Sequence, residues 1–98
     1  MSYFVTVSFD IANATRENYQ TMYRELQIIG LSHSLTSDAN NTITLPSTTV
    51  AGSLNGSSAG AVRDHVCNQV QNAYTRNRLH GEVFVAVGGD WAWGHRTP

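Results

Sequence analysis

A run of alternating side chains near the start of the chain, residues 3–9, constrains the fold more than any other feature. Its β-branched and aromatic residues alternate with a period of two, which predicts a strand that ends in a carboxylate, Asp10. We expect helices to cover the uniformly apolar face and the mixed face to stay open. The apolar face carries Tyr3, Val5, Val7 and Phe9; the mixed face carries Phe4, Thr6, Ser8 and Asp10.

Two segments have the residue spacing of amphipathic helices. After a capping residue, Asn13 or Thr15, apolar side chains recur every three or four residues, which predicts a first helix. Ser57 or Ser58 caps a second segment of the same kind, which runs to about Leu79. Each helix therefore has one face to bury.

Three more segments are typical of strands: residues 31–35, 42–52 and 82–88. Pro46 interrupts the middle segment and implies a bulge, a bend or an edge position. The resulting order is βαββαβ, and two amphipathic helices are most simply buried against one face of a four-stranded antiparallel sheet. Right-handed crossovers then give the strand order 4-1-3-2. We predict a single ferredoxin-like α+β domain over residues 1–98.

Composition limits the classes of partner. The 98 residues carry a formal net charge of −1 and only 13% charged side chains, with no basic tail, so strong non-specific nucleic-acid binding is not indicated. A small domain with few surface charges favours a homodimer. No stretch reaches the ~20 apolar residues of a membrane span. The single cysteine, Cys67, allows no intrachain disulfide, favours a cytoplasmic location, and is expected to be a small buried hydrophobe.

The predicted topology decides which ionisable residues lie near Asp10. The end of the first strand lies beside the start of the last strand, so His80 and Glu82 are expected neighbours, and Asp38 lies toward the same end of the sheet. Asp90 follows the far end of the last strand, roughly 20 Å away. We therefore name Asp10, His80 and Glu82 as candidate catalytic residues and Asp10 as a candidate metal ligand.

An open face that carries Asp10 allows a metal site shared between two chains. A two-fold dimer that packs open face against open face brings Asp10 close to its symmetry mate. Facing carboxylates repel each other unless a cation or a proton lies between them, and oxygen ligands suit Mg²⁺ or Mn²⁺. Such an ion can activate water for phosphodiester hydrolysis. The alternative is that Asp10 is an ordinary turn acid near a helix N-terminus.

The segment Val7-Ser8-Phe9-Asp10-Ile11, which closes the first strand of a chain with βαββαβ order, resembles a known group. The group comprises the CRISPR-associated ferredoxin-fold proteins that form the second subunit of the spacer-integration complex. The chain also resembles the virulence-associated protein D toxins and the ferredoxin-fold endoribonuclease antitoxins of type V toxin–antitoxin systems. The resemblance implies homodimers that act on RNA or DNA, with Asp10 as the metal ligand of a dimeric nuclease. Unlike the CRISPR-associated group, this chain has no charged residue over residues 45–52.

The tail, residues 89–98, carries the strongest interaction signal: Trp91, Trp93 and Arg96 follow a pair of glycines. Two tryptophans are costly to leave in water. Three arrangements remain open: the tail folds over its own sheet, it forms a dimer arm anchored by Trp and Arg, or its tryptophans stack on bases while Arg96 contacts a phosphate.

Two functions follow. The first is a metal-dependent nuclease or endoribonuclease of the CRISPR-associated or toxin–antitoxin group, centred on Asp10 and requiring Mg²⁺ or Mn²⁺. The second is a non-catalytic dimeric scaffold or protein-interaction module. The position of Asp10 favours the first, and the near-neutral charge favours the second.

Overall fold

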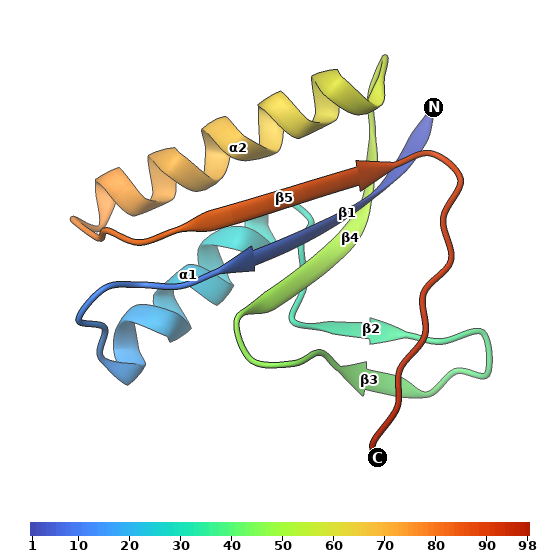
Figure 1. Cartoon of the computed structure of the whole chain (residues 1–98), viewed down its shortest axis with the longest axis horizontal. Helices are drawn as coiled ribbons and strands as arrows, with labels where there is room; N and C mark the ends of the chain where they lie inside the picture. Colours follow the sequence, from blue (N-terminus) through green and yellow to red (C-terminus); the bar gives the residue numbers. More distant parts are fainter.

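The computed structural model describes all residues, 1–98, and contains two helices and five strands (Figure 1). In chain order the elements are β1 (Ser2–Phe9), α1 (Arg16–Ile28), β2 (Ser34–Thr36), β3 (Thr42–Thr44), β4 (Thr49–Asn55), α2 (Ala59–Arg76) and β5 (Val83–Gly88). The α+β class is confirmed. No helix is both long enough and apolar enough to cross a bilayer.

The predicted four-stranded sheet of order 4-1-3-2 is wrong. The main sheet has three antiparallel strands in the order β4-β1-β5, and β2 and β3 form a separate two-stranded hairpin. The expected strand over residues 42–52 is divided at Pro46: β3 ends before it, and Thr48 adopts a positive φ of 62° before β4 begins. Proline has no N–H for a ladder and Thr48 turns the backbone, so pairing cannot continue through this point.

One bridge joins the chain segment before the hairpin to the main sheet. Ser32 and Ala51 each donate a backbone N–H to the other's carbonyl, at 2.8 and 2.9 Å. The expected second strand, residues 31–35, is otherwise replaced by β2, which pairs with β3 alone. The β4 edge is therefore partly covered, whereas β5 has a neighbour on one side only.

Both helices begin at capped positions. Thr15 forms a capping box: its hydroxyl accepts the Asn18 N–H, and the Asn18 side chain accepts the Thr15 N–H at 2.9 Å. Ser58 caps α2 by accepting the Ala61 N–H at 3.0 Å. The caps satisfy backbone donors that a helix start leaves without partners, so they fix where each helix begins.

The core lies between the helices and one face of the sheet. β1 is the central strand, and its odd-numbered residues are all buried, as the alternation predicts. The fully buried side chains are Met22, Leu26, Leu31, Val5, Val7, Val50, Val66 and Val70. Cys67, expected to be buried, is exposed because α2 presents its other side to the core.

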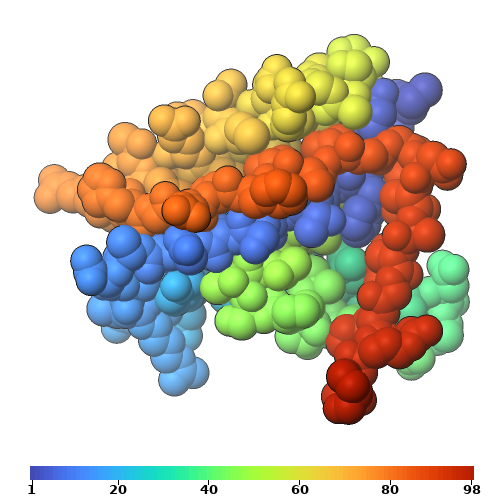
Figure 2. Space-filling view, in the orientation of Figure 1, coloured from blue at the N-terminus to red at the C-terminus, as the bar shows by residue number.

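The opposite face of the sheet is not covered by a helix. Figure 2 shows β5, β1 and β4 side by side on this face, with the tail running along one side toward the β2–β3 hairpin. The pairing register and the strand alternation assign nine side-chain positions to it: Phe4, Thr6, Ser8, Thr49, Ala51, Ser53, Phe84, Ala86 and Gly88. We call this set the open face. None of its members is charged and Ala51 is buried, while Asp10 and Glu82, just beyond the strand positions, border the face beside Phe84.

Candidate functional site

Asp10 lies where the sequence argument places it, at the end of β1 and beside the start of β5. Its N–H donates to the Glu82 carbonyl at 2.9 Å, and its side-chain Oδ1 accepts the Glu82 N–H at 2.9 Å. The carboxylate thus completes the ladder between the two strands where a backbone carbonyl would ordinarily do so. Asp10 therefore stabilises the pairing of β1 with the start of β5.

The backbone carbonyl of Asp10 accepts a hydrogen bond from a different residue. The Tyr74 hydroxyl, from α2, donates to it at 2.5 Å. Burial of Tyr74, together with the negative charge of Asp10 and the nearby Tyr19, raises the pKa of the Tyr74 phenol to about 12, so the hydroxyl keeps its proton at neutral pH. Gly81 passes so close that a Cβ built on it would lie 2.0 Å from the Asp10 carbonyl oxygen. We call Asp10, Tyr74, Gly81 and Glu82 the strand-end clamp.

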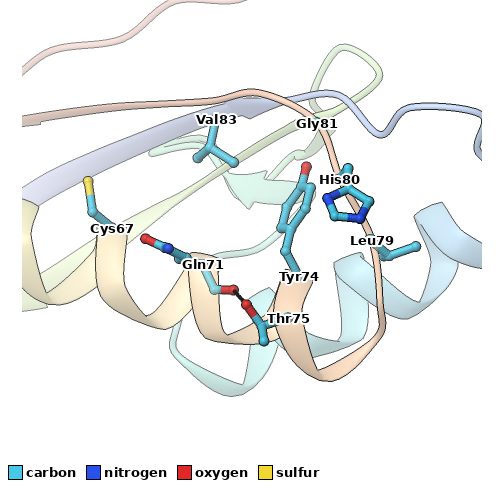
Figure 3. A pocket seen from close by; sticks show the side chains of 8 residues that line it. All are labelled: Cys67, Gln71, Tyr74, Thr75, Leu79, His80, Gly81 and Val83. Atoms are coloured by element: carbon cyan, nitrogen blue, oxygen red, sulfur yellow. Dashed lines mark hydrogen bonds between the residues drawn. The ribbon is translucent and has the colours of Figure 1, made fainter.

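The structure brings two of the three candidate catalytic residues together. Asp10 and Glu82 line one shallow hollow of about 410 Å³, together with Ser8, Thr48 and other residues around the strand end. His80 lines a different hollow, of about 430 Å³, between α2 and β5. In Figure 3 the His80 ring lies on the helix side of the chain, near Tyr74 and Leu79. His80 joins the Asp10 region through its backbone: its carbonyl accepts the Ala12 N–H at 2.7 Å.

Within one chain, no three side chains of His, Cys, Asp or Glu converge as a candidate metal-binding group. Asp38 lies at the turn of the β2–β3 hairpin and lines a hollow with the tail, away from Asp10. Asp90 follows the far end of β5, as expected. Asp10 and Glu82 are the acidic residues that line the hollow at the strand end. Their oxygen chemistry fits a hard divalent cation.

The tail folds back over its own chain at its first tryptophan. The ring of Trp91 stacks on Phe4, with centroids 5.8 Å apart and an interplanar angle of 23°. Trp91 and Trp93 then line a hollow of about 570 Å³ against the hairpin, and they remain 40% and 38% exposed. Arg96 donates a hydrogen bond to the neighbouring His95 carbonyl and makes no ion pair.

Phe84 is the surface residue that the sequence argument missed. It is 69% exposed on the open face and pairs in register with Ser8. The alternating valines of β5 indicate the core-facing side of the strand, and Phe84 lies between two of them on the opposite side. The sequence contains a signal for this exposure: Phe84 stands between two valines, and strand alternation places it on the face opposite to theirs.

No family model, no curated protein and no solved structure matches this chain.

Proposed function

We propose that the chain is a non-catalytic homodimeric scaffold, an interaction module that makes its contacts through the open face and the tryptophan tail. The observation that carries the proposal is the chemistry of the open face: its nine strand positions carry no charge, and Phe84, on the edge strand β5, is 69% exposed. Interface cores are depleted in charged residues and enriched in aromatic ones. A large apolar side chain exposed on such a face, as Phe84 is, is typical of an interaction site.

The stack of Trp91 on Phe4 supports the same proposal. It extends the apolar surface from the sheet onto the tail without burying either tryptophan completely. Partly exposed tryptophans beside an uncharged sheet are typical anchors of protein contacts. The low charge of the whole chain is consistent with a protein partner and with self-association.

Replacing Phe84 by serine tests the contact surface. We expect Phe84→Ser to raise the dimer dissociation constant about tenfold or more, because a buried phenyl side chain contributes about 1.5–3 kcal/mol. The measurement is light scattering on a dilution series. Ile28→Ser is the matched control, since Ile28 is 81% exposed on α1, away from the open face. Equal dissociation constants for the two variants would show that the open face around Phe84 makes no contact.

The hollow shared by Asp10 and Glu82 favours a second candidate, a metal-dependent nuclease or endoribonuclease acting on RNA or DNA. In this candidate Mg²⁺ or Mn²⁺ takes carboxylate oxygens of Asp10, with one Asp10 from each chain of a face-to-face dimer. The bound ion would supply an activated water for phosphodiester hydrolysis. Glu82 would orient the water, and the position of His80 in another hollow leaves it outside this site.

Asp10→Asn separates the nuclease from the scaffold. Asparagine keeps an Oδ1 that can accept the Glu82 N–H, so the fold should be retained while a charged metal ligand is lost. The scaffold proposal predicts no cleavage of RNA or DNA by either protein in Mg²⁺ or Mn²⁺. Metal-dependent cleavage by the wild type that Asp10→Asn reduces by a hundredfold or more would establish the nuclease instead.

A further inference from the structure

The free edge of β5 has the features of a strand that pairs with another strand. β5 lies at one end of the order β4-β1-β5, and its sequence, Val-Phe-Val-Ala-Val-Gly, contains no proline and no charged residue. Exposed edges in stable monomers are ordinarily protected by lysine, proline, a bulge or a covering loop. None of these protects β5, whereas the other edge of the sheet is bridged by Ser32.

The hydrogen-bond pattern shows which backbone groups point outward. The Asp10 N–H bonds to the Glu82 carbonyl, and antiparallel bonding alternates along a strand. Phe84 and Ala86 therefore turn their backbone groups toward β1. Val83, Val85 and Val87 turn theirs to the free edge, where the structure gives them no hydrogen-bond partner.

We propose that a second copy of the chain pairs along this edge, β5 against β5, antiparallel about a two-fold axis at Val85. This inference rests on the proposed homodimer and names its interface. In this register Val85 faces its symmetry mate, and Val83 faces Val87 of the other copy. Every outward backbone group of the three valines then finds a partner in the same strand of the second chain.

The side chains fit the same register. On the open face, the highly exposed Phe84 lies against Ala86 of the second copy, whose small side chain leaves room for the ring. On the helix face, Val87 of the second copy lies opposite Val83, beside the hollow between α2 and β5. Figure 3 shows Val83 pointing toward α2, with Cys67 and Gln71 on the facing turns of the helix. Pairing with β5 of the second copy would place that copy's Val87 beside this hollow.

The α2 residues that line the hollow beside the β5 edge place no charge next to a second strand. The residues that line the hollow from α2 are Cys67, Gln71, Tyr74 and Thr75, and the set contains no acidic or basic residue. A two-fold axis perpendicular to the sheet places both helix layers on one side and both open faces on the other. The dimer thus joins the two sheets into one six-stranded open face, with Phe84 and Ala86 of each copy at the seam between the chains.

This dimer keeps the two Asp10 residues apart. Glu82, the pairing partner of Asp10, is three residues from Val85, roughly 10 Å along the strand, and β1 lies one strand further out. The two Asp10 carboxylates are then separated by more than about 20 Å. Edge pairing and the shared-metal nuclease therefore require different dimers, and the interface distinguishes them.

Two substitutions at Val85 test the interface. Val85→Pro removes an outward N–H without removing a ladder bond to β1, and we expect it to raise the dimer dissociation constant at least about tenfold. Val85→Cys, in a Cys67→Ser background, should form an interchain disulfide on mild oxidation, since paired Cα atoms about 5.5 Å apart are within disulfide range. Ser53→Cys, on β4 in the same background, is the control and should stay uncrosslinked.

The outcomes separate this inference from the proposed function. Crosslinking at Val85 but not at Ser53 supports the edge interface even where the proline variant is too unstable to measure. A dimer that neither substitution affects overturns the β5 interface and leaves the homodimer standing. A chain that sediments as a monomer at every concentration overturns both.

Discussion

Gly81→Ala should unfold at a much lower urea concentration than the wild type, with a loss of about 3 kcal/mol in the free energy of unfolding. A Cβ at this position would lie 2.0 Å from the Asp10 carbonyl oxygen and 2.9 Å from the Asp10 carbonyl carbon, both backbone atoms that cannot move aside. Relief of the clash must separate the start of β5 from the end of β1. The Tyr74 hydrogen bond to the same carbonyl would then be strained or lost.

Gly88→Ala is the matched control for this change. Gly88 lies at the other end of β5, and a Cβ built there meets no heavy atom within 4 Å. Its stability should stay within about 0.5 kcal/mol of the wild type. If Gly81→Ala is as stable as Gly88→Ala, the close approach at the strand-end clamp is wrong, and with it the tight placement of Asp10.

Gly52→Ala should lower the free energy of unfolding by about 2–3 kcal/mol. The first contacts to be lost should be those at the β4 edge of the sheet, opposite β5. A Cβ on Gly52 would lie 2.1 Å from the carbonyl oxygen of Gly30, where the chain leaves α1 with a φ of +95°. The clash pushes the segment after α1 away from β4. The bridge between Ser32 and Ala51 should open first.

Hydrogen exchange gives a local readout for Gly52→Ala. The Ser32 amide donates to Ala51 at 2.8 Å, so its protection should fall further than that of β1 amides at the centre of the sheet. Gly88→Ala again serves as the control and should leave the Ser32 amide protected. Uniform loss of protection across the sheet would contradict the local account, because it would mean that the bridge opens only with the whole domain.

Much of what positions Asp10 could be predicted from local pattern and strand order. The alternation over residues 3–9 correctly assigned the buried face of β1, and the antiparallel relation of the first and last strands correctly placed Glu82 beside Asp10. The cap at Thr15 was one of two candidates, and its capping box with Asn18 decides between them. These features depend on short-range periodicity and on few alternatives.

The errors came from effects that no local pattern contains. The proline at position 46 was recognised, but whether it bends a strand or ends it depends on what pairs on either side, and here β3 pairs with β2 instead of the main sheet. Gly52 and Gly81 look like ordinary loop or helix-ending glycines in the sequence. Both positions require glycine because a Cβ would clash with a backbone carbonyl, that of Gly30 or that of Asp10, which is distant along the chain.

Two predictions about individual side chains were wrong for a similar reason. His80 was predicted beside Asp10 because the end of the first strand lies near the start of the last strand, yet its side chain lines the hollow between α2 and β5 while Asp10 and Glu82 line another. Cys67 was predicted to be buried from its neighbour Val66, and one residue of helix rotation, about 100°, places it on the exposed rim. The side of the chain on which each of these two side chains lies is decided by the packed structure.

Sedimentation equilibrium of the wild-type chain, from low micromolar to several hundred micromolar, tests the central claim most directly. A homodimeric scaffold with an uncharged open face predicts masses that approach twice that of one chain as the concentration rises, with little change between low and high salt because the contact is uncharged. The mass of a single chain throughout the concentration range would contradict the account.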